Sequence, residues 1–175
     1  FENIAAENNG HIDILVNSAG GSARGKANNV VDQSIEAFDE ILNINLRGAM
    51  ICAKEAAKYM ISNKYGRIIN ITSVIGLQGK AGYSEYAASK GGILALTRAM
   101  AIEFAKENIR VNAVLPGAVD TPMLRSGLER GHLAGQSVTE RLDNLARKTV
   151  NGRIGQPEEI AQAVYFLAEN SHSSF

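Results

Sequence analysis

Residues 66–117, GRIINITSVIGLQGKAGYSEYAASKGGILALTRAMAIEFAKENIRVNAVLPG, decide the fold of this chain. Two short runs rich in isoleucine and valine, RIINIT at 67–72 and IRVNAVL at 109–115, enclose a long helical pattern from Tyr83 to Glu107. Runs of this length and β-branched content are typical of buried strands, and a helix between two of them indicates a parallel crossover. The stretch therefore predicts a strand–helix–strand unit.

The same alternation extends to both sides of this unit. A third apolar run, IDILVN at 12–17, precedes a helical pattern from Ser34 to Met60 that we expect to be broken or kinked near Asn45. The three runs together predict an α/β fold with a parallel sheet. Two later helices are predicted at 137–148, which opens with the capping pattern S-x-x-E, and at 157–169, which opens with a proline.

The segment from Pro122 to Gly135 contains helix-forming residues but also three glycines, Gly127, Gly131 and Gly135. Glycine lowers helix propensity, so we expect a mobile segment there. Because it follows the third strand, we expect the longer stretch 122–150 to act as a substrate lid.

The chemistry is indicated by Tyr86 and Lys90, which are four residues apart and so share one face of the predicted helix. A phenol is a poor acid at neutral pH because its unperturbed pKa is about 10, and a neighbouring ammonium lowers that pKa. Ser73, thirteen residues before the tyrosine, could hold the oxygen that exchanges a proton with it. The pattern favours proton transfer at a carbonyl or alcohol oxygen. The pair alone also fits an ordinary helix with a half-buried tyrosine and a solvated lysine.

Ligands of parallel α/β sheets bind beyond the carboxyl ends of the strands. Each predicted strand here is followed by polar residues or glycines, which are Asn17 to Gly21, Thr72 and Ser73, and Pro116 and Gly117 followed by Val119, Asp120 and Thr121. Ser73 therefore falls where chemistry is expected. The glycines also suit plain turns, and Asn17 could simply cap a strand.

The composition is that of an ordinary globular protein, with 45% hydrophobic and 21% charged residues. Eighteen acidic and eighteen basic residues leave no net charge, which gives no reason to expect nucleic acid or an anionic membrane as a partner. No apolar run has the length of a membrane span. Cys52 is the only cysteine, so we expect a cytoplasmic protein without an internal disulfide. His11, His132 and His172 lack metal-ligand spacing, so no metal site is expected.

Five motifs in this order resemble those of the short-chain dehydrogenases/reductases, which are NAD(P)-dependent oxidoreductases with a Rossmann-type three-layer α/β/α fold. They are N-S-A-G at 17–20, N-I-N-L-R-G at 43–48, I-N-I-T-S at 69–73, Y-A-A-S-K at 86–90 and R-V-N-A-V-L-P-G at 110–117 followed by Thr121. A further stretch, G-R-I-G-Q-P-E-E-I-A at 152–161, is similar to one in bacterial members. The resemblance is strongest to bacterial 3-oxoacyl-carrier-protein reductases and related alcohol and sugar dehydrogenases.

The resemblance implies a catalytic set of Asn45, Ser73, Tyr86 and Lys90. Tyr86 would be the general acid in reduction and the base in oxidation, and Lys90 would lower its pKa and bind the nicotinamide ribose. Ser73 would polarise the substrate oxygen, and Asn45 would hold a water that links Lys90 to solvent. The implied cofactor is NAD or NADP, without a choice between them, and its implied binding residues are Asn17, Ala19, Gly20, Tyr86, Lys90, Pro116, Gly117, Val119 and Thr121.

One family motif has no counterpart in this sequence. Family members carry a glycine-rich phosphate-binding turn and about three strands before the N-S-A-G motif. No such turn precedes Ile12, and the chain ends before the family's last strand. We therefore expect residues 1–175 to form a single but incomplete NAD(P)-binding domain, a portion of a longer gene product that by itself binds the cofactor weakly or not at all. The strand at 12–17 would then be an apolar sheet edge.

Two alternative functions remain open. Tyr83 stands seven residues before Lys90, which is the spacing of the family's enoyl reductases, although Ser73 and Tyr86 together argue against that activity. The other alternative is a non-catalytic oligomerisation module made by truncation.

The expected partners are a small-molecule carbonyl or alcohol substrate and further copies of the chain. The apolar helices at 46–60 and 83–104 need burial on several sides, so we expect a homodimer or homotetramer assembled through them. The walls expected around the substrate, 74–78, Tyr83 and the segment 122–150, mix apolar and charged residues and favour no single substrate.

Overall fold

The structure is a computed structural model that describes residues 1–22, 29–129 and 137–169. Three parallel strands, β1 (Ile14–Asn17), β2 (Gly66–Ile71) and β3 (Ile109–Val114), form a sheet in the order β1–β2–β3. In this register Asn17 pairs with Asn70, and Arg67 pairs with Arg110. The predicted strands are confirmed, with ends that differ by one or two residues.

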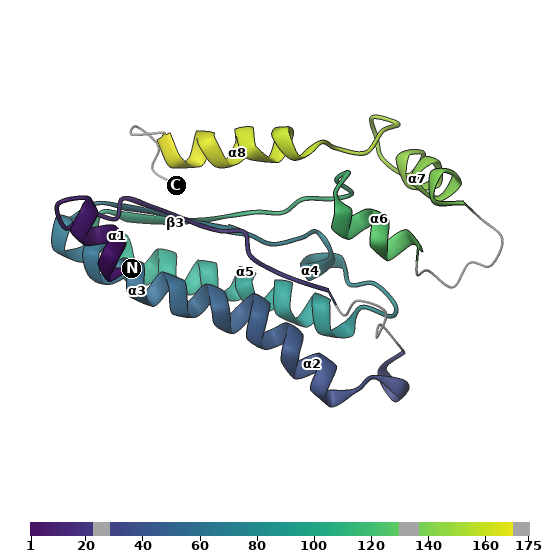
Figure 1. Cartoon of the computed structure of the whole chain (residues 1–175), viewed down its shortest axis with the longest axis horizontal. Helices are drawn as coiled ribbons and strands as arrows, with labels where there is room; N and C mark the ends of the chain where they lie inside the picture. The colour runs from purple at the N-terminus through teal and green to yellow at the C-terminus, as the bar shows by residue number, and fades with distance from the viewer. Residues whose placement is uncertain (23–28, 130–136, 170–175) are drawn as a thin grey trace.

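Helices cover both faces of the sheet (Figure 1). On one side, α3 (Gly48–Asn63) contacts β1 and β2, and α5 (Ser84–Phe104) contacts β3. On the other side, α8 (Pro157–Glu169) lies over β2 and β3. This arrangement is the predicted Rossmann-type α/β/α fold. The remaining elements are α1 (Glu2–Glu7), η1 (Val30–Asp32), α2 (Ile35–Leu42), η2 (Asn43–Arg47), α4 (Ile75–Gln78), η3 (Ala105–Glu107), α6 (Pro122–Glu129) and α7 (Val138–Ala146).

The hydrophobic core lies between the sheet and the helices α3 and α5. Alternate residues of a strand point to opposite faces, so Ile68 and Val111 face these helices together. Alanines on α3 let its backbone come close to the sheet. The core cluster consists of Ala5, Ile12, Ala53, Ala56, Met60, Ile68, Met100, Ile109 and Val111.

The predicted break near Asn45 is confirmed as a π-helical turn, η2, between α2 and α3. Such a turn contains one residue more than the regular helix and leaves some backbone groups without their usual partners. Its Leu46 packs on α5, because a Cβ added at Gly92 would lie 2.7 Å from Leu46 Cδ2. The preceding residue, Asn45, is 1% exposed and donates a hydrogen bond to Ser89 Oγ of α5 at 2.9 Å.

The segment after β3 differs from the sequence prediction. We expected a mobile segment from Pro122, but residues 122–129 form helix α6. The Thr121 hydroxyl accepts a hydrogen bond from the Leu124 amide at 3.2 Å, and a proline suits the first turn of a helix. Both features favour the start of a helix at Pro122. Gly127 destabilises a helix by about 1 kcal/mol relative to alanine, and α6 forms despite this cost. Gly131, Gly135, His132 and His172 lie outside the described residues.

The later helices follow the prediction closely. α7 begins at Val138 after a complete capping box between Ser137 and Glu140, and α8 spans the predicted 157–169. The short helix α4 was not predicted.

One face of the sheet carries exposed apolar residues. β1 is an edge strand, as expected, and its Ile14 and Val16 are 47% and 41% exposed on the face opposite the core. On the same side, Tyr165 and Phe166 of α8 are also exposed. Within residues 1–22, 29–129 and 137–169, no helix combines the length and apolar character needed to cross a bilayer.

Candidate active site

The four predicted catalytic residues converge at the carboxyl end of the sheet. Ser73 follows β2, Tyr86 and Lys90 lie in the first two turns of α5, and Asn45 comes from the π-helical turn. A contact between two backbone segments fixes Ser73, Tyr86 and Lys90 relative to one another. A Cβ added at Gly76 of α4 would lie only 2.8 Å from the Gly91 nitrogen and the Lys90 carbonyl carbon, so the backbones of α4 and α5 touch where Ser73 meets α5.

Ser73 lies close to Tyr86. Ser73 is 7% exposed, and its hydroxyl oxygen accepts a hydrogen bond from the Ile75 amide at 3.2 Å. The Ser73 hydroxyl is also near enough to Tyr86 to lower the pKa of the phenol. The two hydroxyls can therefore act on one and the same oxygen atom of a bound compound.

Burial shifts the titration of Tyr86. It raises the pKa of Tyr86, the Ser73 hydroxyl offsets part of that rise, and the nearby Tyr83 adds to it. The lowering of this pKa by Lys90 stays a prediction. Lys90 Nζ lies 5.8 Å from the centre of the Tyr86 ring and donates its hydrogen bond to the Ile71 carbonyl at 2.8 Å. The ammonium is thus directed at the end of β2 rather than at the phenol.

Lys90 is itself perturbed. It is 5% exposed, and burial lowers the pKa of Lys90 from 10.5 to about 8. Desolvation disfavours the charged form, and the single backbone hydrogen bond does not compensate for it. The site therefore contains a lysine that can gain and lose a proton near neutral pH, one helical turn from Tyr86.

Asn45 ties the loop after β1 to α5. Its Oδ1 accepts a hydrogen bond from the Gly21 amide at 2.8 Å, and its Nδ2 donates to the Gly21 carbonyl and to Ser89 Oγ, both at 2.9 Å. The Ser89 hydroxyl donates in turn to the Tyr86 carbonyl at 2.9 Å. A Cβ at Gly20 would lie 3.1 Å from Asn45 Oδ1 and 3.5 Å from Lys90 Nζ, so Gly20 borders both side chains.

The predicted cofactor residues lie in two loops. Ala19 and Gly20 follow β1. The Asn17 side chain instead donates a hydrogen bond to Asn70 Oδ1 of the neighbouring strand β2 at 2.9 Å. Asn70 Nδ2 then donates to Thr97 Oγ1 of α5 at 2.9 Å. Asn17 therefore supports the cleft through a buried polar network rather than facing it.

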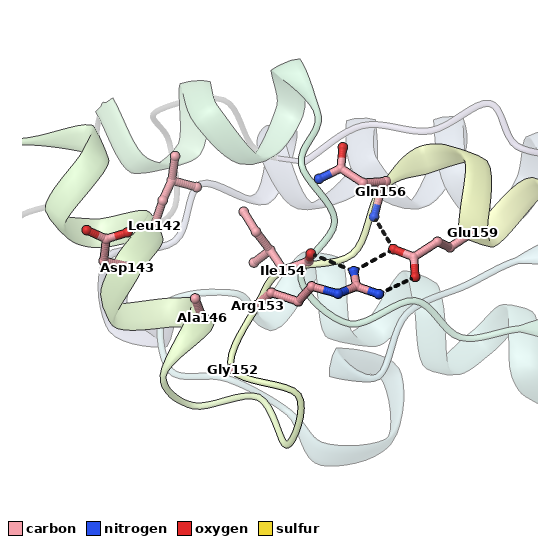
Figure 2. Close-up of a pocket in the computed structure, with 8 residues that line it drawn as sticks. All are labelled: Leu142, Asp143, Ala146, Gly152, Arg153, Ile154, Gln156 and Glu159. Carbon is pink, nitrogen blue, oxygen red and sulfur yellow. Dashed lines mark hydrogen bonds and ion pairs between the residues drawn. The ribbon is translucent and has the colours of Figure 1, made fainter.

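The second loop follows β3. The Val74 amide donates to the Pro116 carbonyl at 3.1 Å, which joins this loop to the Ser73 loop. Gly117 and Val119 line a cavity of about 280 Å³, whose other walls come from residues 149–160. Thr121 begins α6. A second cavity of about 630 Å³ lies beside it, between α7 and the start of α8 (Figure 2).

Several residues that shape the site were not assigned a role from the sequence. Ser89 stands inside the Y-A-A-S-K motif, and its position one turn after Glu85 on the buried face of α5 was the available signal. Asn70 and Thr97 are distant in sequence from Asn17, and no local pattern links them. Among the residues that the structure describes, no group of three or more histidine, cysteine or acidic residues is arranged to hold a metal ion.

Known proteins similar to this chain include several oxidoreductases. A family model described as enoyl-(acyl carrier protein) reductase matches residues 1–175. The 3-oxoacyl-[acyl-carrier-protein] reductase FabG of Thermotoga maritima is 39% identical over 169 residues, which cover 94% of this chain and 61% of that protein. The chain thus spans about three fifths of the length of the curated relatives it matches.

Solved structures show the same fold. NADP-bound ElxO superposes with a TM-score of 0.85 at 29% identity, covering 99% of this chain and 66% of that one. NAD⁺-bound xylitol dehydrogenase superposes with a TM-score of 0.83 at 31% identity, covering 95% of this chain and 66% of that one.

Proposed function

This chain belongs to the short-chain dehydrogenase/reductase family, and we propose that it interconverts a carbonyl compound and a secondary alcohol with NAD or NADP as the hydride carrier. The observation that carries the proposal is that Ser73, at the carboxyl end of β2, lies close enough to Tyr86 to lower the pKa of the phenol, with the buried Lys90 one turn away. The names of the relatives support it, since the similar proteins reported above include a reductase and a dehydrogenase.

Tyr86 would exchange the proton of this reaction. Its raised pKa keeps the phenol protonated at neutral pH, which suits an acid that donates a proton to the carbonyl oxygen during reduction. In the oxidative direction the phenolate would accept the proton of the alcohol. The Ser73 hydroxyl would hold the same oxygen and stabilise the negative charge that develops on it. The nicotinamide supplies or accepts the hydride when it is bound.

Lys90 and Asn45 would return the proton to Tyr86. Lys90, with its pKa of about 8, can release and take up a proton at working pH. Because both hydrogens of the Asn45 amide are already donated, a water held by this residue would bind its main chain or Oδ1. This proton path stays a proposal.

The chain's residues fit a nicotinamide cofactor. Gly20 leaves open the space between Asn45 and Lys90 that a side chain would fill, and the Lys90 ammonium, which donates to the Ile71 carbonyl, borders that space. Ala19, Gly20 and Lys90 on one side, and Pro116, Gly117, Val119 and Thr121 on the other, would hold it. ElxO with NADP and xylitol dehydrogenase with NAD⁺ are both similar, so we propose either dinucleotide.

The first substrate to test is a 3-oxoacyl thioester, because the Thermotoga relative is named for that activity. Enoyl reduction is the second candidate, since the matching family model is described by it. The closeness of Ser73 to Tyr86 favours the carbonyl, because one hydroxyl can donate the proton while the other stabilises the charge on the same oxygen. Turnover of acetoacetyl thioester without crotonyl thioester supports our choice, and the opposite pattern reverses it.

We also propose that α6 and α7 form a lid over the substrate within the segment 122–150. The two helices are joined, since Arg141 of α7 donates a hydrogen bond to the Leu128 carbonyl near the end of α6. The predicted lid also includes residues 130–136, which lie outside the described residues.

The assembly we propose is a homodimer or homotetramer of a cytoplasmic protein. Helices 46–60 and 83–104 expose Met50, Ile51 and Ile102, which are 46%, 43% and 81% exposed. Exposed apolar residues on neighbouring helices suit a subunit interface. Light scattering that gives a strict monomer would contradict it.

The decisive experiment replaces Tyr86 by phenylalanine in the complete protein that carries this chain. Tyr86→Phe removes the exchangeable proton and keeps the ring, so turnover should fall by about 10²-fold or more, the usual share of general acid catalysis, with an unchanged melting temperature. Retained turnover would refute the role of Tyr86. If the wild-type protein turns over no carbonyl or enoyl substrate with either cofactor, the non-catalytic module is the better description.

A further inference from the structure

The stretch 152–161 resembled a motif of bacterial relatives but received no role. In the structure it contains a two-pronged ion pair (Figure 2). Arg153 Nη1 donates to Glu159 Oε2 at 2.8 Å, and Arg153 Nη2 donates to Glu159 Oε1 at 2.7 Å. Parallel bonds of this kind fix orientation as well as distance.

The same pair holds the backbone between its two members. Glu159 Oε2 also accepts a hydrogen bond from the Gln156 amide at 2.7 Å, which caps the first turn of α8. Arg153 Nη1 donates to the Ile154 carbonyl at 3.2 Å, and Thr149 Oγ1 donates to the Arg153 carbonyl at 2.8 Å. The path of residues 153–156 is thus set by one carboxylate and one guanidinium.

This backbone supports the loop after β3. Val119 and Gly155 form an isolated parallel bridge. The Asp120 amide donates to the Gly155 carbonyl and the Gly155 amide donates to the Ala118 carbonyl, both at 2.9 Å. Residues 118–120 lie between Gly117 and Thr121, two of the proposed nicotinamide-binding residues.

Arg153 and Glu159 also stand between the two cavities. Both side chains line the cavity of about 280 Å³ that contains Gly117 and Val119, and both line the cavity of about 630 Å³ beside α7. A change in this ion pair therefore directly affects the cavity that Gly117 and Val119 also line.

We propose that Arg153 and Glu159 are positioning residues that hold the loop 117–121 in the conformation that binds the nicotinamide half of the cofactor. The inference rests on the proposed function. Neither side chain needs to touch the cofactor, because the effect passes through the Val119–Gly155 bridge. An exposed ion pair contributes little by itself, but this one is two-pronged and caps a helix, so its loss should weaken dinucleotide binding about three- to tenfold.

The test compares two ligands in the complete protein. Calorimetry gives the dissociation constants of the dinucleotide and of its fragment without nicotinamide, ADP-ribose or its 2′-phosphate. Arg153→Met should raise the dissociation constant of the dinucleotide about three- to tenfold. It should leave the dissociation constant of the fragment unchanged, because only the nicotinamide half contacts the loop 117–121. Equal weakening of both ligands would mean a general loss of structure and would overturn the proposal, as would no change in either.

Further variants separate charge from geometry. Arg153→Lys keeps the charge but not the two parallel bonds, and Glu159→Gln keeps an acceptor for the Gln156 amide. Each should show a smaller effect than Arg153→Met, and Arg153→Met with Glu159→Gln should be no worse than Arg153→Met alone. The control is Lys64→Met, which removes the ion pair of Lys64 with Glu107 at the amino end of the sheet and should change neither dissociation constant.

Hydrogen exchange tests the contact without any ligand. The amides of Asp120 and Gly155 should exchange faster in Arg153→Met than in the wild type, and equal exchange refutes the proposal. A wild-type protein that binds ADP-ribose but no nicotinamide dinucleotide refutes the proposed function itself. A wild type that binds the dinucleotide and a variant that binds it equally well refute the positioning role alone.

Discussion

The contact between α4 and α5 can be tested by adding one methyl group. In Gly76→Ala the new Cβ would lie 2.8 Å from the Gly91 nitrogen and the Lys90 carbonyl carbon, where ordinary contacts begin at 3.4 Å. The atoms it meets are backbone atoms inside a helix, so they cannot rotate away. α4 must therefore move from α5 by roughly 0.6 Å, at a cost of about 1–3 kcal/mol typical of overpacking.

The same displacement carries Ser73 away from Tyr86. A misplacement of about 1 Å can cost about 10²-fold in rate, so a shift of roughly half that should lower turnover about tenfold. Urea denaturation measures the stability, and initial rates of the complete protein measure the turnover.

Gly127→Ala is the matched control, because it makes the same chemical change in α6, where no atom of the described residues outside its own helix lies within 4 Å of the new Cβ. It should stabilise the protein by up to about 1 kcal/mol through helix propensity. If Gly76→Ala matches the wild type in both stability and turnover, the close packing of the two helices does not position Ser73.

Two further predictions concern buried polar groups. Ser89→Ala leaves one hydrogen of the buried Asn45 amide without its acceptor, so it should destabilise the protein by about 1–3 kcal/mol in urea, whereas the exposed Ser62→Ala should be neutral within error. Because burial lowers the pKa of Lys90 to about 8, the unfolded chain binds more protons than the native one between pH 8 and 10.5, the ordinary pKa of a lysine. The stability of the wild type should therefore rise across that window relative to Lys90→Met, and parallel urea midpoints for the two proteins would contradict the buried position of Lys90.

The parts of the fold that were predictable are those with a local signal. The strands at 66–71 and 109–114 are runs of β-branched residues, and the break at Asn45 interrupts a helical pattern. Helix α4 has four residues with Gly76 among them, which is too short for a periodic pattern. The glycines of residues 122–135 predicted a mobile segment, whereas the Thr121 cap favours the helix α6.

The parts of the site that were not predictable depend on contacts distant in sequence. The spacing of Tyr86 and Lys90 places them on one face of α5, but it does not say that Lys90 Nζ will donate to the Ile71 carbonyl at the end of β2. The network of Asn17, Asn70 and Thr97 joins two strands and a helix, so it exists only once the sheet is assembled. The motif at 152–161 is visible in the sequence, but no local pattern predicts the bridge from Gly155 to Val119.

The π-helical turn has a consequence for insertions and deletions. It amounts to one surplus residue between α2 and α3, so removal of a residue such as Ile44 would restore a regular helix and leave the buried faces of α2 and α3 nearly where they are. Each residue of an α-helix turns the chain by about 100°, so a deletion inside α2 or α3, where no surplus residue exists, would rotate one part of the helix by that angle. Either Ala37 and Ile41 of α2 or Ala53 and Ala56 of α3 would then leave the interior. Removal of the surplus residue would instead take away the wide turn that carries Asn45, so this turn serves the site rather than the core.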